Sequence, residues 1–244
     1  MEVPALIAQL SADGPMLIAA AQRAGWDAPV PATNWAVRDL VLHIGGVHRW
    51  AADIVTTGSR TGDTAAGRAV GTGPDDDGLI EWFKAGHATL VEALQAASAD
   101  LDCFTFLPAP SSLHFWARRQ AHETAIHRVD AEGAAREFTG FDSDFAQDGI
   151  AELLNGFAHR KSNAIATRGT IGLDAGDGAS WLITVGGERI ECVESEELVG
   201  TDVTIRGVSS DLYLWLWNRP TEAVVDGDDE IAQLWAGTVR VRWT

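Results

Sequence analysis

Cysteine is scarce in this chain of 244 residues, which contains only Cys103 and Cys192, far apart and outside any recognisable motif. Two distant cysteines argue against a small secreted domain held together by disulfides and favour a reducing compartment, so we expect a cytoplasmic protein. Neither cysteine lies beside a histidine or in a helix N-terminal motif, and we therefore expect neither to act as a nucleophile.

Basic charge is also scarce, because 18 lysines and arginines face 35 aspartates and glutamates, for a net charge of −17. An acidic surface repels nucleic acid and anionic membranes, so we expect small-molecule partners, with the chain a monomer or a homodimer. The first residues lack the basic-then-apolar pattern of a signal peptide. We also expect no apolar run near the roughly 20 residues of a membrane span.

The most informative segment is 116–132, WARRQAHETAIHRVDAE, which predicts one helix with a polar face. It looks like the zinc-protease signature H-E-x-x-H, but three residues separate Glu123 from the second histidine. Residues turn by about 100° in a helix, so His122 and His127 point roughly 140° apart and cannot bind one ion together. Glu123 and His127 lie about 40° apart and can. A third ligand must then come from another helix.

His43 is the predicted third ligand, because it shares an inward helix face with Leu40 and Val47. A lone inward histidine is usually a satisfied core residue. That interpretation weakens here, since Glu123 and His127 lie on another inward face and a buried carboxylate needs a partner such as a metal. The sequence therefore predicts a divalent metal site made of His43, Glu123 and His127.

Two further side chains are weaker candidates for this site. Asp130 follows His127 by three residues on the same face, where it would either orient the imidazole or form a surface salt bridge with Arg128 or Arg136. His87 is a candidate fourth ligand, although a surface or supporting role is favoured.

Apolar residues at helical spacing predict four long helices in the first part of the chain. The glycine-rich loop 58–78 separates two of them and could cover a site; its acidic run at 75–77 lacks the spacing of a calcium loop. Such helices would form a four-helix bundle over residues 1–142. The predicted helices span residues 3–24, 37–57, 79–97 and 112–135.

The pattern changes after residue 140, where alternation of period two and the pair Gly186-Gly187 predict strands and a hairpin. The chain is thus predicted to be α+β, with a small domain over 143–244 whose sheet is mainly antiparallel. The predicted elements are helices over 144–163, 209–217 and 228–236 and strands over 181–185, 188–193, 202–206 and 239–243.

Three motifs carry a family resemblance. W-x-V-R-D-L-x-x-H ends at His43, W-x-x-R-x-x-H-E-x-x-x-H-R-x-D-A-E starts at Trp116, and SSDLYLWLWNR covers 209–219. Together they resemble the mycothiol-dependent maleylpyruvate isomerase family of the DinB-like superfamily, over nearly the whole chain and in the same order. The resemblance implies a DinB-like bundle with a bound metal, zinc in our expectation, followed by the family's C-terminal domain.

The resemblance also implies a chemistry. Mycothiol would bind the metal through sulfur, and its thiolate would add to a conjugated cis double bond; rotation and loss of the thiol give the trans isomer. In S-transferase relatives the thiol product is kept. Arg219, at the end of the C-terminal motif, would bind a substrate carboxylate from a site shared by both domains, although an arginine that closes a helix is common. The preference for arginine over lysine is compatible with an actinobacterium, where mycothiol is made.

The residues alone leave other functions open, because a metal with three protein ligands activates whatever fills its open position. One alternative is a hydrolase that uses metal-activated water. The other is a non-catalytic, metal-binding regulatory protein of the same fold, against which the intact ligand set counts.

Overall fold

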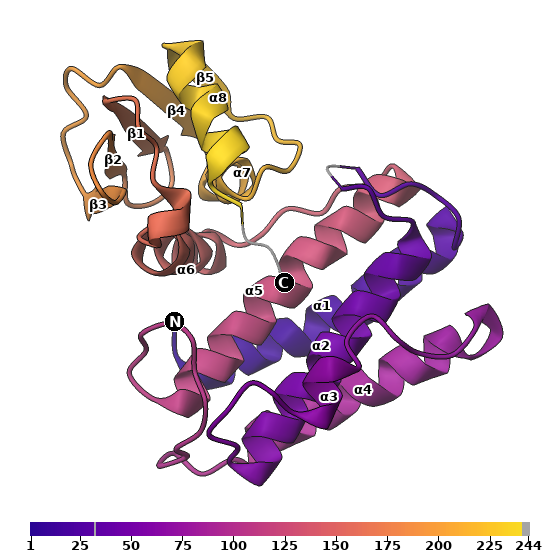
Figure 1. Ribbon diagram of the computed structural model, residues 1–244. Helices are drawn as coiled ribbons and strands as arrows, with labels where there is room; N and C mark the ends of the chain where they lie inside the picture. The colour runs from indigo at the N-terminus through magenta and orange to yellow at the C-terminus, as the bar shows by residue number, and fades with distance from the viewer. Residues whose placement is uncertain (32, 241–244) are drawn as a thin grey trace. The chain divides into compact units, whose positions relative to one another are not determined.

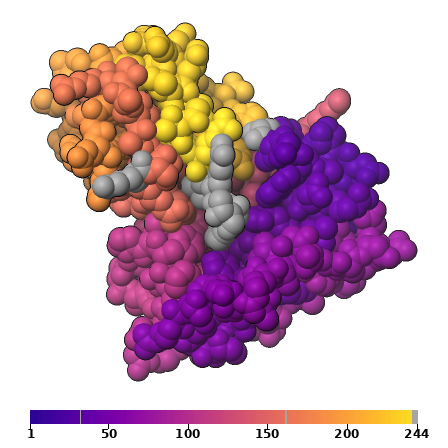
Figure 2. Space-filling model, viewed as in Figure 1, coloured from indigo at the N-terminus to yellow at the C-terminus, as the bar shows by residue number. Residues whose placement is uncertain are grey.

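The computed structural model describes residues 1–31 and 33–240 and divides into two compact units, Met1–Thr139 and Gly140–Thr244 (Figure 1). The division falls three residues before the predicted boundary at 142. Figure 2 shows the first unit, coloured from indigo through magenta, with all of its atoms. The expected α+β fold, with a helical part before a sheet-containing part, is confirmed.

The first unit is built from four long helices and one short one. The short helix α3 lies inside the predicted loop, and Thr64 begins it by accepting a hydrogen bond from the Gly67 N–H at 3.1 Å. The fourth helix starts three residues earlier than predicted, because Asp76 and Asp77 suit the positive end of a helix. The helices are α1 (Val3–Ala24), α2 (Val37–Thr57), α3 (Ala65–Arg68), α4 (Asp76–Ala96) and α5 (Ser112–Ala135).

Short polar contacts begin the two helices that carry the candidate ligands. The Ala36 N–H donates to Oδ2 of Asp39 at 3.0 Å, so Asp39 pairs the backbone N–H at the N-cap, where the alanine side chain itself makes no capping hydrogen bond. Ser111 caps α5 by accepting the His114 N–H at 3.1 Å. Every residue from 119 to 132 of α5 is buried, so the polar face that the sequence predicts is enclosed rather than solvated. Each polar group there needs a partner.

Helix α1 is long and apolar enough, by length and composition, to cross a membrane. The expectation that no segment approaches a membrane span is therefore wrong for this helix. Within the bundle, Leu6, Leu10 and Leu17 are fully buried, and α1 packs mainly against α5. The core helix of a folded domain passes the same test of length and composition, and α1 has this place in the structure.

A buried charge cluster joins α1 to α5. Nε of Arg128 lies 3.4 Å from Oδ1 of Asp13, and both side chains are almost wholly enclosed. Burial raises the pKa of Asp13, although the charge of Arg128 opposes the shift. Arg128 also donates to the Thr139 carbonyl at 2.9 Å, and the Thr139 N–H donates to Glu132 at 3.0 Å. The cluster thus fixes the end of the first unit as well.

The second unit contains a five-stranded sheet with the order β3-β2-β1-β4-β5. Only the β1–β4 pair is parallel, so the sheet is mainly antiparallel, as the sequence predicts. Its strands are β1 (Gly169–Ala175), β2 (Trp181–Val185), β3 (Glu191–Glu194), β4 (Val203–Gly207) and β5 (Val224–Gly227). Its helical segments are α6 (Ser143–Glu152), the π-helical turn Leu153–Phe157, the 3-10 turn Lys161–Asn163, α7 (Ser209–Leu216) and α8 (Asp229–Thr238).

Several predicted boundaries in this unit are wrong. Strand β1 was not predicted, because two glycines hide the alternation of its buried residues Ile171 and Leu173. Strand β5 was missed because all four of its residues are exposed. The helix predicted over 144–163 changes to a π-helical turn after Glu152. Of the strand predicted over 239–243, residues 241–243 lie outside the described part of the chain, and no strand includes residues 239 and 240.

The buried charge cluster makes a stability prediction. Arg128→Met leaves the Asp13 carboxylate buried without this ion pair, so the free energy of unfolding should fall by about 3–5 kcal/mol. Arg23→Met is the matched control, because Arg23 forms an exposed pair with Glu137 between the same two regions and should change little. Urea denaturation at pH 7 measures both. Equal losses in the two variants would contradict the prediction.

Candidate metal centre

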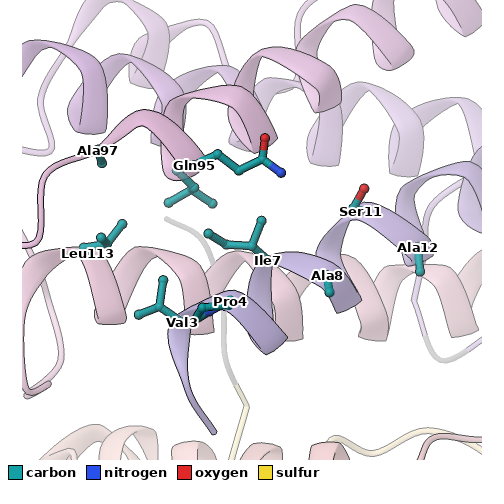
Figure 3. Close-up of a pocket in the computed structure, with 10 residues that line it drawn as sticks. Val3, Pro4, Ile7, Ala8, Ser11, Ala12, Gln95, Ala97 and Leu113 are labelled. Atoms are coloured by element: carbon teal, nitrogen blue, oxygen red, sulfur yellow. The ribbon is translucent and has the colours of Figure 1, made fainter.

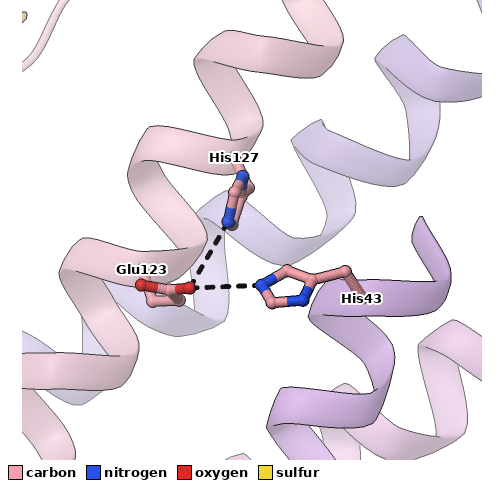
Figure 4. A group of neighbouring side chains, drawn as sticks. All are labelled: His43, Glu123 and His127. Atoms are coloured by element: carbon pink, nitrogen blue, oxygen red, sulfur yellow. Dashed lines mark ion pairs between the residues drawn. The ribbon is translucent and has the colours of Figure 1, made fainter. Parts of the chain in front are cut away.

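The structure brings the three predicted ligands together in the middle of the bundle. His43 comes from α2, and Glu123 and His127 come from α5 (Figure 4). Their ligand atoms all lie within 4.8 Å of one another, and all three side chains are buried. Within residues 1–31 and 33–240, this is the one group of such side chains with the spacing of a metal site.

The distances within the group fit a tetrahedral ion. Oε1 of Glu123 lies 3.5 Å from Nε2 of His43 and 3.3 Å from Nε2 of His127. Nitrogen and oxygen ligands about 2.0–2.1 Å from a tetrahedral zinc ion are separated by roughly 3.4 Å. The two separations that involve the carboxylate oxygen therefore match those around such an ion, and all three ligand atoms lie within 4.8 Å of one another.

Two neighbours hold the ligands of α5 in place. Nδ1 of His127 lies 2.9 Å from Oδ2 of Asp130, so the imidazole presents Nε2 to the centre of the group. Of the two alternatives for Asp130, the orienting contact is the one present, because Asp130 is buried rather than on the surface. Arg119 donates to Oε2 of Glu123 at 3.1 Å. It is not among the site residues predicted from the sequence. Its signal was the arginine in W-x-x-R-x-x-H-E.

Burial and hydrogen bonds compete to set the protonation of the site. Burial penalises the charged imidazole of His127, but hydrogen bonds with Asp130 and Glu123 outweigh it and raise the pKa to about 9. Burial likewise opposes the charged form of Glu123, yet its contacts with His127, His43 and Arg119 hold the pKa well below the usual range. At neutral pH, His127 therefore carries a proton that a metal ion must displace.

Trp35 forms an aromatic wall beside the two histidines. Its ring centroid lies 4.9 Å from that of His43 and 6.1 Å from that of His127, with which it stacks. Trp35 is only partly buried, so it is more accessible than His43 and His127, which are both buried. The sequence showed it only as the first residue of the W-x-V-R-D-L-x-x-H motif.

The other two histidines considered lie outside the group. His87 contacts the Leu10 carbonyl at 2.9 Å through Nε2 and stacks on Phe83, so it is not a fourth ligand. His122 is buried on α5, and the cluster does not include it, in agreement with the helical geometry.

A groove of about 640 Å³ on the first unit is a separate feature (Figure 3). It lies between the start of α1, the end of α4 and Leu113 of α5. Leu113 precedes Glu123 by ten residues, which is roughly 15 Å along the helix. No ionisable side chain is among the described residues that line the groove. Its lining residues are Val3, Pro4, Ile7, Ala8, Ser11, Ala12, Leu94, Gln95, Ala97 and Leu113.

The sequence models of two domains from one protein family together match most of the chain. The mycothiol maleylpyruvate isomerase N-terminal domain matches residues 7–132, and the C-terminal domain of the same family matches residues 144–234. The chain belongs to the mycothiol maleylpyruvate isomerase family. The resemblance predicted from the three motifs is thereby confirmed.

Solved structures agree with this family at the level of the fold. A crystal structure of a mutant mycothiol-dependent maleylpyruvate isomerase has a TM-score of 0.65 at 12% identity. A second crystal structure of mycothiol-dependent maleylpyruvate isomerase has a TM-score of 0.63 at 13% identity. Both comparisons cover 93% of this chain and 93% of the other. No curated protein matches the chain.

In the second unit, Arg219 is the last residue of the motif SSDLYLWLWNR and lies just after α7. Its N–H donates to the Leu214 carbonyl at 2.9 Å and its guanidinium to the Trp217 carbonyl at 2.7 Å, which closes the helix. Arg206 is exposed and pairs with Asp174 and Asp226. The catalytic assignment of Arg219 stays a prediction.

The ligand set predicts which variants keep a metal. Purified protein should contain about one divalent ion per chain. His43→Ala, Glu123→Ala and His127→Ala should each lose it, whereas His122→Ala, on the same helix, should keep it. Elemental analysis of protein purified without chelator gives the result, with circular dichroism to check folding. Loss of metal in the His122 variant alone would reject the ligand set.

The raised pKa of His127 predicts proton release. Because the pKa of His127 is about 9, the imidazole carries a proton at pH 7.5. Metal binding at this pH should therefore release about one proton from it. Affinity should therefore rise with pH up to about 9 and level off above it. Asp130→Asn removes a contact that raises this pKa, so the variant should release less than the wild type at pH 8. Calorimetry in two buffers of different ionisation enthalpy counts the protons, and no release at pH 7.5 would contradict the assignment.

Proposed function

We propose that this protein is a metal-dependent and mycothiol-dependent enzyme, an isomerase or S-transferase in which a thiolate adds to an electrophilic double bond. The observation that carries the proposal is the close grouping of His43, Glu123 and His127, with their ligand atoms within 4.8 Å of one another, in a member of this family. A divalent ion, zinc in our proposal, would supply a positive position that stabilises a thiolate at neutral pH.

The residues around the site favour a thiol over water as nucleophile. Hydrolases of the zinc-protease kind pair the metal-activated water with a carboxylate that acts as general base. Here the Glu123 carboxylate faces both histidines with one oxygen and accepts from Arg119 with the other. Asp130 is engaged with His127. A thiol needs less help, because its pKa is close enough to neutral for a nearby charge to ionise it.

Local charge supports an anionic ligand despite the net charge of the chain. Two neutral imidazoles and one carboxylate around a divalent ion leave a net charge of +1. The site residues are almost wholly buried, so this charge acts at short range with little screening. It would attract a thiolate or a substrate carboxylate, while the acidic surface repels nucleic acid.

We further propose that Arg219 binds a carboxylate of the substrate. A guanidinium binds a carboxylate through two parallel hydrogen bonds, which fixes the orientation of the bound molecule. A small cis-configured unsaturated acid would offer both the electrophilic carbon and the anionic handle. The cytoplasm, where thiol cofactors stay reduced, is the compartment that suits this chemistry.

Turnover of such acids with and without mycothiol tests the proposal. Wild-type protein should act only with mycothiol, and His43→Ala should be inactive with or without it. Arg219→Ala should keep its metal and lose about 1.5–3 kcal/mol of transition-state stabilisation, the value of a charged hydrogen bond. Arg206→Ala, an exposed arginine of the same unit, is the control and should act like wild type.

The products separate the remaining alternatives. An isomerase returns the thiol unchanged, whereas an S-transferase consumes one thiol per product. Hydrolysis that proceeds equally well without mycothiol would reject the thiol mechanism. If the protein binds the metal but turns over none of these acids, with or without mycothiol, the result would instead favour a non-catalytic, metal-binding regulatory protein.

A further inference from the structure

Arg119 is the most enclosed charged side chain near the candidate metal centre, with no exposed surface. It lies one helical turn before Glu123 on α5, and its guanidinium donates to Oε2 of that carboxylate at 3.1 Å. Burying a guanidinium is expensive, so a fixed arginine in a bundle core has to be matched by an ionic partner. Glu123 is such a partner.

The two oxygens of Glu123 have different neighbours. Oε1 faces Nε2 of both histidines, at 3.5 Å and 3.3 Å. Oε2 faces away from them toward Arg119. A free carboxylate can bind a metal through one oxygen or both, and the second mode uses a further coordination position. In this structure the two oxygens are divided between the histidines and Arg119.

We propose that Arg119 is a positioning residue that restricts Glu123 to binding the metal through Oε1 alone and so keeps a coordination position open for the incoming ligand. The proposal rests on the proposed metal site. The contact of Arg119 with Oε2 of Glu123 bears on how that carboxylate can bind the ion. Its effect is therefore on coordination geometry, which can be measured without any substrate.

Cobalt(II) is the probe, because its visible absorption is strong in four-coordinate sites and weak in sites of higher coordination. Arg119→Met removes the guanidinium and keeps an unbranched, buried side chain of comparable length. Oε2 then loses this hydrogen bond and can turn to the ion. The absorption per bound cobalt should fall, and cobalt affinity should weaken by about 10–100-fold, as for other residues that support metal ligands.

Two further variants make the test specific. Arg118→Met changes the neighbouring, partly exposed arginine and should keep the wild-type spectrum and affinity. Arg119→Lys keeps the buried charge and so protects folding, but its single ammonium cannot reproduce the planar guanidinium, so its spectrum should lie between the other two. Should Arg119→Met fail to fold by circular dichroism, the lysine variant decides.

The outcomes separate this proposal from the one on which it rests. Wild-type protein that binds no cobalt would overturn both the metal site and the role of Arg119. Wild-type protein that binds cobalt, with an unchanged spectrum in folded Arg119 variants, would overturn the role of Arg119 alone, whatever their affinity. A weakened spectrum confined to the Arg119 variants would support the restriction of Glu123 to one oxygen.

Discussion

The carboxylate of Glu123 lies on a helix whose middle is enclosed on all sides, so its charge has to be met by its neighbours. It is met by imidazoles of His43 and His127 on one side and by the guanidinium of Arg119 on the other. Breaking one partner of such a buried group costs several kcal/mol. The positions of α2 and α5 are therefore tied to the geometry of this site.

The same helix carries a second buried charge group farther along. Arg128, paired with Asp13 of α1, contacts Thr139 at the end of the first unit. Along α5, one group of charges therefore faces α2 and the other faces α1. A helix with this much buried charge is costly in a core, and a bound cation would offset part of that cost at the first group. This is a physical reason to expect the metal as part of the folded state.

Helical periodicity could predict that Glu123 and His127 share a face, because their spacing fixes it whatever packs against the helix. It could not predict that residues 119–132 of α5 are buried on every side, since that depends on the other helices packing around it. Arg119 was missed for that reason. In the second unit, the hairpin at Gly186-Gly187 carried a local signal. Strand β1 did not, because Gly169 and Gly172 interrupt the pattern and its parallel partner is distant in sequence.

The central claim is that two histidines and one glutamate hold an ion that receives the sulfur of a thiol. X-ray absorption at the zinc edge, on protein loaded with one zinc per chain, tests it most directly. Without thiol, the account predicts only nitrogen and oxygen neighbours at about 2.0–2.1 Å, with the signature of two imidazoles. With mycothiol, one sulfur neighbour should appear at about 2.3 Å. A sulfur neighbour before the thiol is added, or none after it, would contradict the account.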